Sequence, residues 1–393
     1  MAREYKDVVV GLDIGTAKVM AVVAEVLPNG ALKLAGLGVA PSNGLKRGVV
    51  VNIDATVQSI QQALKEAELM ADCKIQRVYT GITGSHIRGQ NSRGMVAIKD
   101  KEVTATDVAR VVETAKAISI SSDQRLLLVE PQEFIIDGQE VKEPIGMSGI
   151  RLEANIHIVT GAQSAAENII KCVRRCGLEV EQLMLNPLAS SQAVLTDDER
   201  ELGVAVVDIG AGTTDVAIFT GGAIRHTAVI PAAGDLITSD IAMALRTPTK
   251  DAEDIKVESG YAKQLLADPE AQVEVPGLGD RGPRLLSRQV LAGVIEPRVE
   301  EIFSLVSKPS ATRATKRFCL RALCSPEAAR SCLAWWSWGK IFFSNRCAGV
   351  CPSIPAPWPT WWPSPVRPPS WGSWKKHAWH ACAASRWRPR VAL

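Results

Sequence analysis

The fold of this chain is decided by the stretch Val204-Ala205-Val206-Val207-Asp208-Ile209-Gly210-Ala211-Gly212-Thr213-Thr214-Asp215. A run rich in β-branched residues leads to an aspartate, a glycine-rich turn with two threonines follows, and a second apolar run begins at Val216. This order predicts a β-hairpin whose tip exposes backbone N–H groups and a carboxylate. Glycine at such a tip lets the backbone approach a bound phosphate closely.

The same signature stands near the N-terminus, in Val8-Val9-Val10-Gly11-Leu12-Asp13-Ile14-Gly15-Thr16-Ala17-Lys18. Taken alone, each copy fits an ordinary hairpin with a glycine turn as well as it fits a phosphate-binding one. Two copies far apart in the chain fit one hairpin in each of two lobes. We therefore expect the two tips to grip one nucleotide phosphate chain from both sides, with hydroxyl donors from Thr16, Thr213 and Thr214.

Asp13 and Asp208 occupy equivalent places in the two hairpins. Mg²⁺ prefers carboxylate oxygens and keeps several of its water ligands. The pair is therefore predicted to hold Mg²⁺ indirectly, through bridging water.

Hydrophobic periodicity elsewhere predicts helices over about residues 53–70, 105–117 and 162–176. Alternating and β-branched runs predict strands over about residues 78–82, 95–98, 125–136, 152–159 and 182–185.

Both hairpins resemble the paired phosphate-binding loops of the actin-like ATPases. Within that superfamily the chain is most similar to the FtsA family of bacterial cell-division proteins. The resembling stretches lie within residues 1–306, at 11–19, 81–87, 186–191, 207–215 and 230–242. The resemblance implies an α/β, actin-like two-lobed ATPase fold with ribonuclease H-like sheets, an inserted small α+β subdomain and an irregular C-terminal tail.

The resemblance also implies a division of the chain. The first lobe core takes residues 1–84 and 163–195, and the inserted subdomain takes residues 85–162. The second lobe core takes residues 196–225 and 291–306, and its outer subdomain takes residues 226–290. Residues 307–393 form an aberrant tail rich in Trp, Pro and Arg.

ATP and Mg²⁺ are the cofactors that the resemblance implies. The implied cofactor-binding residues are Asp13, Gly15, Thr16, Ala17, Lys18, Asp208, Gly210, Gly212, Thr213, Thr214, Gly234, Asp235, Glu253 and Lys256, with Asp13 and Asp208 also at the metal. Gly234 and Asp235 stand at a predicted turn before a helix, where backbone N–H groups can meet phosphate. Glu253 and Lys256 share one helix face, which fits a ribose and base contact and equally fits a surface ion pair.

No catalytic residue is predicted. Gln192 and Asp197 follow the residues that begin the interlobe helix in the superfamily, and they are weak candidates for positioning an attacking water. A plain helix cap and connector explains them better. We therefore expect a nucleotide-binding structural protein with at most weak ATPase activity, in which ATP acts by favouring one lobe arrangement over another.

The partners that the resemblance implies are the C-terminal peptide of the tubulin-like FtsZ on residues 226–290, further copies of the chain in a polymer, later division proteins on residues 85–162, and the inner membrane. The implied place is the cytoplasmic face of that membrane at the division septum. A terminal amphipathic helix makes the membrane contact in the family. Residues 378–393 show no helical apolar stripe, so we expect this contact to be absent or accidental here.

Three alternatives share these loops. The first is a pilus-assembly ATP-binding protein such as PilM, and capture by an FtsZ peptide separates it. The second is a sugar or metabolite kinase, which needs a carboxylate aimed at a substrate hydroxyl. The third is a non-functional product, which a titration with Mg-ATP separates.

Charge is distributed very unevenly along the chain. Residues 1–306 hold 31 of the 45 Lys and Arg and 41 of the 42 Asp and Glu, and all ten Trp lie between Trp335 and Trp387. The net charge of +3 therefore combines −10 in residues 1–306 with +13 in residues 307–393. Such an average does not indicate a nucleic-acid partner.

The composition of the tail indicates translation in a shifted frame, since GC-rich coding DNA read out of frame yields Trp, Arg, Pro, Cys and Ala. Trp has a single codon, so several residues of the alternative frame are forced. That frame permits VLTGGSAVMPG over residues 323–333, a string that looks like the family's third nucleotide motif. We predict a frameshift close to Val306 that removes this adenosine-contacting motif, a late strand of the second lobe's sheet and its covering helix, and that impairs function. A genuine Trp- and Pro-rich interaction tail is the alternative.

Sequencing the coding DNA around the Val306 codon tests the frameshift. Restoring one base there is expected to open a longer frame that ends in a basic amphipathic helix. A restored frame that soon reaches a stop codon would contradict the prediction.

The remaining signals are weak. Residues 1–7 lack the apolar core of a signal peptide, and no apolar run reaches the roughly 18 residues of a membrane span. Cys73, Cys172 and Cys176 have no metal-binding spacing, so we expect reduced thiols.

Overall fold

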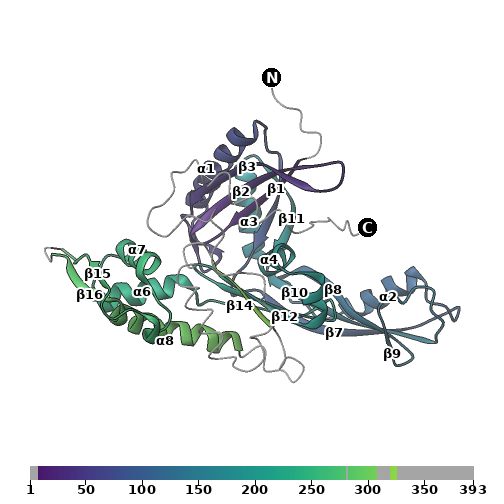
Figure 1. The fold of residues 1–393 in the computed structure, drawn as a ribbon. Helices are drawn as coiled ribbons and strands as arrows, with labels where there is room; N and C mark the ends of the chain where they lie inside the picture. The colour runs from purple at the N-terminus through teal and green to yellow at the C-terminus, as the bar shows by residue number, and fades with distance from the viewer. Residues whose placement is uncertain (1–7, 280–281, 308–318, 325–393) are drawn as a thin grey trace.

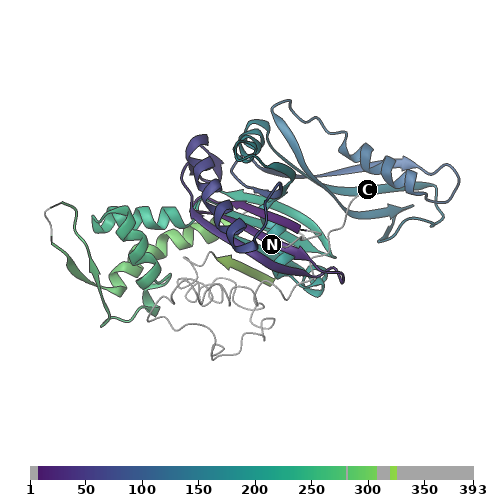
Figure 2. The ribbon, with the colours of Figure 1, turned by 90° about the horizontal axis from the view of Figure 1, so that it is seen from above.

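The computed structural model describes residues 8–279, 282–307 and 319–324, the side chains of the last segment excepted. Two lobes meet in the middle of the molecule, and the inserted subdomain and the subdomain of α6–α8 lie at opposite ends of it (Figures 1 and 2). The predicted frameshift lies close to Val306, next to residues that are not described. Most of the third nucleotide motif and the whole terminal membrane contact also lie outside the described residues.

The first lobe is built on a five-stranded sheet in the order β11-β6-β1-β2-β3. β1 pairs antiparallel with β2 and parallel with β6, and β11 joins β6 in parallel. The elements of this lobe are β1 (Val8–Ile14), β2 (Lys18–Val26), β3 (Leu32–Pro41), the short β4 (Leu45–Lys46) and β5 (Val49–Val50), α1 (Ile53–Ala71), β6 (Arg77–Ile82), α3 (Gln163–Arg175), β11 (Glu179–Leu185) and α4 (Asn186–Val194).

Helix α1 lies unusually close to β3. Its apolar side chains face the sheet, and the Asn52 side chain caps its start by accepting from the Ala55 N–H. Gly36 and Gly38 of β3 face the backbone of α1, and a Cβ atom at either position would overlap it. The two glycines therefore permit the helix to sit directly on the strand.

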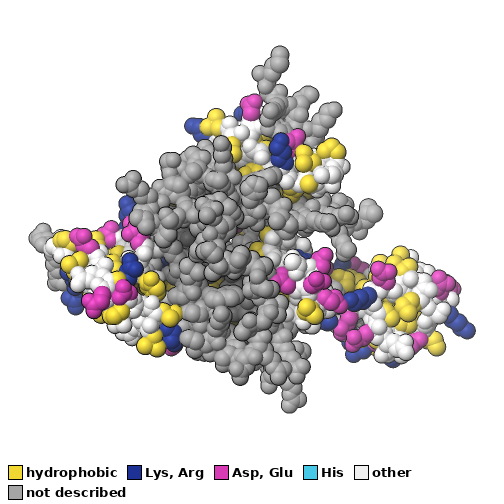
Figure 3. All heavy atoms as spheres, in the orientation of Figure 1, with side chains coloured by type: hydrophobic (Ala, Val, Ile, Leu, Met, Phe, Trp, Pro, Cys, Tyr) yellow, Lys and Arg dark blue, Asp and Glu magenta, His cyan; other side chains and the backbone are white. Residues whose placement is uncertain are grey.

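The inserted subdomain is a second, separate sheet in the order β7-β10-β8-β9, with α2 packed on it. Thr104 and Asp107 form a capping box that fixes the start of α2. Its elements are β7 (Arg88–Ala97), α2 (Ala105–Lys116), β8 (Gln124–Ile136), β9 (Gln139–Val141) and β10 (Arg151–Ala162). On the face seen in Figure 3, acidic and basic side chains are interspersed on this subdomain.

The second lobe has a four-stranded sheet in the order β14-β13-β12-β17. Its core strands carry apolar side chains on both faces, and Val206 and Val207 are both fully buried. The elements are α5 (Asp197–Leu202), β12 (Val204–Ile209), β13 (Thr214–Thr220), β14 (Ala223–Ile230), α6 (Gly234–Leu245), α7 (Thr249–Ser259), the 3₁₀ turn η1 (Gln264–Leu266), β15 (Gln272–Val275), β16 (Arg284–Ser287), α8 (Arg288–Ser307) and β17 (Cys319–Cys324).

Helices α6 and α8 share one core with the second lobe's sheet. Ile237 and Ile241 of α6 and Ile295 and Val299 of α8 belong to the same buried cluster as Val207. The boundaries expected at residues 225/226 and 290/291 fall inside β14 and α8.

Strand β17 corrects the expectation that the second lobe loses its late strand. It pairs in parallel with β12 along its whole length, from Val204 opposite Cys319 to Ile209 opposite Cys324. A ladder is made by backbone N–H and C=O groups, which any non-proline residue supplies. The loss of the strand was expected because the sequence of the third nucleotide motif is missing. Backbone pairing does not require that sequence.

The three predicted helices are confirmed as α1, α2 and α3. Most strand predictions are also confirmed, with longer bounds in the structure. The strand predicted at 95–98 is the end of β7, whose first residues are mostly exposed and polar and therefore show no alternation.

Candidate functional site

The two hairpin tips have the same local geometry. In the first, the Gly15 N–H donates to the Lys18 carbonyl at 3.0 Å, and in the second the Gly210 N–H donates to the Thr213 carbonyl at 2.9 Å. Asp13 stands opposite Met20 in the β1–β2 ladder, and Asp208 stands at the matching place opposite Asp215 in the β12–β13 ladder. The repeat seen in the sequence is thus a repeat of structure.

The tips come into contact across the two lobes. A Cβ atom added at Gly212 would lie 2.6 Å from Thr16 Oγ1 and 2.9 Å from the Cα atom of Arg47. The Thr16 hydroxyl also accepts from the Gly48 N–H at 3.1 Å. The absence of a side chain at Gly212 is what lets the second tip approach the first.

Asp13, Asp208 and Asp215 form a carboxylate cluster between the lobes. The pKa of Asp13 is raised to about 6, mainly by burial and then by the charge of Asp208, against the opposing charge of Lys18. The Asp13 side chain keeps contact with solvent, although protein atoms surround it closely. Burial also raises the pKa of Asp208, while the hydrogen bond that the Ser190 hydroxyl donates at 2.7 Å lowers it.

Asp215 is the most buried member of the carboxylate cluster, and its side chain is 4% exposed. Burial raises its pKa to about 7, against the hydrogen bond from the Thr83 hydroxyl, and the charges of Asp208 and Asp13 add to the rise. Thr83 Oγ1 donates to Asp215 Oδ1 at 2.5 Å, and this bond joins the first lobe to the second.

Sequence reasoning did not assign Asp215, Thr83, Ser190 or Asn186. Asn186 begins α4 and lies against Gly81, where an added Cβ would also come within 3.6 Å of Asp13 Oδ1. Polar residues follow the ends of β6 and β11 in the stretches 81–87 and 186–191. Because parallel strands end at one edge of a sheet, this pattern was the available signal.

Two expected phosphate donors have other partners. The Gly234 N–H donates to the Gly210 carbonyl at 3.1 Å, and the Asp235 N–H donates to the Ala211 carbonyl at 2.8 Å. These bonds hold the start of α6 against the second tip, so the prediction that both N–H groups are presented to phosphate is wrong. Packing across three elements decides their partners, and local sequence does not show it.

The threonines of the second tip also have internal partners. The Thr214 hydroxyl donates to the Ala232 carbonyl at 2.7 Å, and the Thr213 hydroxyl donates to Asp215 Oδ2 at 3.4 Å. In the first tip, the Ala17 carbonyl accepts from the Ser42 N–H at 3.0 Å. The expected donation from the Thr214 hydroxyl to phosphate is therefore replaced by a bond that fixes the chain before α6.

Glu253 and Lys256 lie on one face of α7 as predicted, and the surface ion-pair alternative is wrong for the lysine. The Lys256 side chain is buried, and its Nζ atom donates to Glu253 Oε2 at 2.6 Å, to Thr238 Oγ1 at 2.9 Å and to the Gly234 carbonyl at 3.4 Å. A positive charge therefore stands beside the junction of α6 with the second tip.

Gln192 lies away from the carboxylate cluster's hydrogen bonds, and its Oε1 atom accepts from Arg200 at 3.0 Å. Asp197 stands in the first turn of α5, where a negative charge stabilises the helix. Both placements agree with the helix and connector explanation.

Within the described residues, no group of three or more His, Cys, Asp or Glu side chains is arranged to hold a metal directly. No described helix combines the length and apolarity that a membrane span requires. Two adjoining cavities of about 340 and 690 Å³ lie elsewhere, between the start of β8, α3 and β11, and Arg125, Ile170 and Arg174 line both.

Two family descriptions match the sequence. "SHS2 domain inserted in FTSA" matches residues 84–160, and "Cell division protein FtsA" matches residues 205–357. The chain is 59% identical over 299 residues to the cell division protein FtsA of Pseudomonas aeruginosa, covering 76% of this chain and 72% of that protein. It is 52% identical over 304 residues to FtsA of Escherichia coli K12, covering 77% of this chain and 72% of that protein.

The chain belongs to the FtsA family. The recognition made from the two hairpins is confirmed, and with it a function in cell division. This identity decides against the pilus-assembly and sugar-kinase alternatives. The second family match continues past Val306, so the expectation that the resemblance ends at that residue is wrong, while the frameshift itself stays a prediction.

The solved "PilM-PilN type IV pilus biogenesis complex" is similar in fold, with a TM-score of 0.59 at 17% identity, and the match covers 85% of each chain. The expected actin-like two-lobed fold with an inserted subdomain is thus confirmed. This chain and the structural neighbour therefore share an architecture.

Proposed function

We propose that the chain binds Mg-ATP between its two hairpin tips and that the bound nucleotide draws the lobes together. The carboxylate cluster carries this proposal. Three carboxylates from two lobes lie together, and the charge of Asp208 raises the pKa of both Asp13 and Asp215. Such a cluster is stabilised by a divalent cation, so the residues present fit Mg²⁺.

Each residue has a distinct role in this proposal. Asp13 and Asp208 hold the cation through water, because Mg²⁺ keeps several of its water ligands and prefers carboxylate oxygens. Gly15, Thr16, Ala17 and Lys18 present the first tip to the phosphates, and Gly210, Gly212 and Thr213 present the second. When bound, Mg²⁺ supplies positive charge to the phosphate oxygens.

The residues around the second tip fix its geometry and contribute charge. Gly234, Asp235 and Thr214 hold the second tip in place by the hydrogen bonds described above. Lys256 and Glu253 stand beside that tip, where they can meet the ribose and base. Because lobe closure brings these groups onto one ligand, ATP acts as a conformational and polymerisation ligand more than as a substrate.

The relatives are cell-division proteins, and we extend the proposal to their setting. The chain forms polymers, binds filaments of FtsZ at the septum, and meets later division proteins through residues 85–162, whereas its link to the cytoplasmic face of the inner membrane is impaired by the predicted frameshift. The FtsZ C-terminal peptide docks on the outer subdomain. Its described residues include two strongly exposed apolar side chains, Leu265 at 86% and Leu285 at 67% exposure, which a partner peptide could cover.

A thermal-shift titration with Mg-ATP tests nucleotide binding. A ligand that binds only the native state stabilises it by about 2.7 kcal/mol at a concentration of about 100 times its Kd. We expect the melting temperature to rise with Mg-ATP and to rise less with ATP in the presence of EDTA. Equal melting temperatures with and without Mg-ATP would overturn the proposal.

Capture of the chain by an immobilised FtsZ C-terminal peptide tests the partner. We expect retention of the parent chain and loss of retention on replacing Leu265 and Leu285 with aspartate. Retention that is unchanged in this variant would place the peptide elsewhere.

A further inference from the structure

The inserted subdomain is joined by its chain to the first lobe and packs side chains on both lobes, with Ile87 and Val159 buried in the first-lobe core. Its chain leaves the first lobe after Thr83 and returns at Gln163. One of its faces packs on β14, the edge strand of the second lobe's sheet, through β7, β8 and β10. This subdomain therefore bridges the two lobes on the side away from α6–α8 (Figures 1 and 2).

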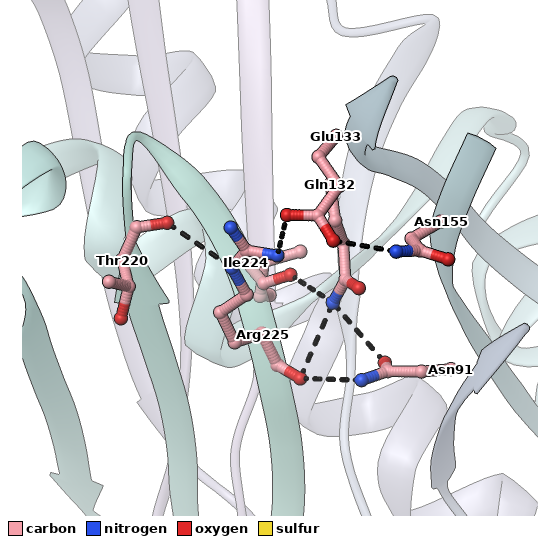
Figure 4. A network of polar contacts seen from close by, with 7 residues as sticks. All are labelled: Asn91, Gln132, Glu133, Asn155, Thr220, Ile224 and Arg225. Atoms are coloured by element: carbon pink, nitrogen blue, oxygen red, sulfur yellow. Dashed lines mark hydrogen bonds and ion pairs between the residues drawn. The ribbon is translucent and has the colours of Figure 1, made fainter. Parts of the chain in front are cut away.

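An ion pair anchors the contact with β14. Arg225 NH1 lies 3.0 Å from Glu133 Oε2, and both side chains are largely buried, at 30% and 24% exposure. Asn155 donates to the other oxygen of the same carboxylate at 2.6 Å. Figure 4 shows these three side chains converging from β14, β8 and β10. A pair held in this way has a fixed geometry, unlike a solvated surface pair.

Side-chain amides of the inserted subdomain also bind the backbone of β14. The Gln132 amide donates to the Ile224 carbonyl at 2.7 Å, and the Asn91 amide donates to the Arg225 carbonyl at 3.2 Å (Figure 4). The hydrogen bonds from Gln132 and Asn91 are made to the backbone of β14. A shift of β14 along its axis therefore breaks them.

The inner end of the contact is close-packed. The His157 ring, which is fully buried, bonds through Nε2 to Thr227 Oγ1 at 2.9 Å and through Nδ1 to Asn91 Oδ1 at 2.5 Å. Burial lowers the pKa of His157 to about 4, so the ring is neutral near pH 7. A Cβ atom at Gly89 would lie 2.9 Å from the Thr227 carbonyl oxygen. The backbones of β7 and β14 therefore approach each other closely at Gly89, where no side chain separates them.

Strand β14 leads directly from this contact to the nucleotide tips. It ends at Ile230, and two residues later the Ala232 carbonyl accepts from Thr214 of the second tip. Gly234 then binds the Gly210 carbonyl of that tip. A movement of the second tip relative to the first lobe is thus a movement of β14.

The connections to the first lobe are suited to a pivot. Gly84 has φ +135, a backbone conformation that favours glycine, and His86 packs between the two connecting strands. The Ala162 N–H donates to His86 Nδ1 at 3.4 Å, a long bond. Leu127, Leu128 and Val159 add apolar packing on the first-lobe core. Apolar packing is non-directional, whereas the contact with β14 is held by an ion pair and directed hydrogen bonds.

We propose that the inserted subdomain moves as one body with the second lobe, pivoting at residues 84–88 and 160–163, so that the nucleotide between the tips sets its orientation. The inference rests on the proposed nucleotide binding and adds the route by which that binding reaches the outer face of residues 85–162. Coupling between two such sites is reciprocal, so weakening the contact with β14 must also change the affinity for Mg-ATP.

Hydrogen–deuterium exchange on the full chain, with and without Mg-ATP, tests the coupling. We expect Mg-ATP to change exchange in peptides covering residues 84–91 and 157–163 of the parent chain. The double variant Arg225→Ala with Glu133→Gln avoids leaving a buried unpaired charge. It is expected to keep a thermal shift with Mg-ATP, to lose most of the exchange response in those peptides, and to change the Kd for Mg-ATP by about fivefold or more.

Lys142→Ala is the matched control, because Lys142 and Glu201 form another ion pair between the inserted subdomain and the second lobe, at 2.6 Å but with 78% and 51% exposure. An exposed pair contributes little, so this variant should respond like the parent. A parent chain that shows the thermal shift without an exchange response overturns the coupling alone, as does a double variant that responds like the parent. A parent chain without the thermal shift overturns the proposed function and the coupling with it.

Discussion

Replacing Asp208 with asparagine is expected to weaken Mg-ATP binding by at least about tenfold, which corresponds to about 1.4 kcal/mol. The substitution keeps the shape of the side chain and an oxygen that can accept from Ser190. It removes the carboxylate charge that, in the proposed function, Asp208 of the second lobe brings to Mg²⁺. The ligand-free protein should be as stable as the parent or more stable, because one of three neighbouring negative charges is gone.

The pKa values of the cluster give this prediction a second readout. The Asp208 charge raises the pKa of both Asp13 and Asp215, so both values should fall in Asp208→Asn. An aspartate with a raised folded-state pKa costs stability as pH rises from its unfolded pKa through its folded one, which for Asp215 spans 3.8 to about 7. The variant should therefore lose less stability over that range.

Thermal denaturation with and without Mg-ATP measures both effects of Asp208→Asn. Glu140→Gln is the control, since Glu140 is an exposed carboxylate on β9 far from the tips. It removes the same charge and should keep the full ligand-induced shift. A full shift in Asp208→Asn would show that the second hairpin's carboxylate has no part in binding.

Replacing Gly38 with alanine is expected to destabilise the protein by about 3 kcal/mol or more, at the upper end of what overpacking costs. A Cβ atom at Gly38 would overlap the Ala63 carbonyl and come within 2.7 Å of the Ala67 N. These neighbours are helix backbone, which cannot rotate aside as a side chain can. Helix α1 would have to leave the sheet, and with it the buried contacts of Ile60 and Ala63.

Gly11→Ala is the matched control for this substitution. Gly11 lies in β1 of the same sheet, and a Cβ atom there meets no atom within 4 Å. The control should stay within about 0.5 kcal/mol of the parent. Urea denaturation followed by circular dichroism compares the two midpoints, and equal midpoints for Gly38→Ala and Gly11→Ala would contradict the close approach of α1 to β3.

Local pattern predicts the hairpins and helices because these elements are specified by neighbouring residues, while the two-lobed fold was implied by the family resemblance. The spacing of apolar residues in 53–70 predicts α1, and the β-branched runs around Asp13 and Asp208 predict both hairpins. β7 was predicted too short, since its exposed residues 88–94 have no core face to produce alternation. Strand β17 was not expected, because its ladder with β12 uses backbone groups alone.

The sequence by itself determined that two like hairpins exist, that each carries an aspartate before a glycine turn, and that the chain belongs with FtsA. Only the tertiary structure decided that Asp215 bonds to Thr83 across the lobes, that Lys256 is buried, and that the N–H groups of Gly234 and Asp235 are bound to the second tip. The physical reason is how far apart along the chain the residues that fix each feature stand. A turn is fixed by residues next to one another, whereas the partner of a buried donor is fixed by whichever distant element packing brings within about 3 Å of it.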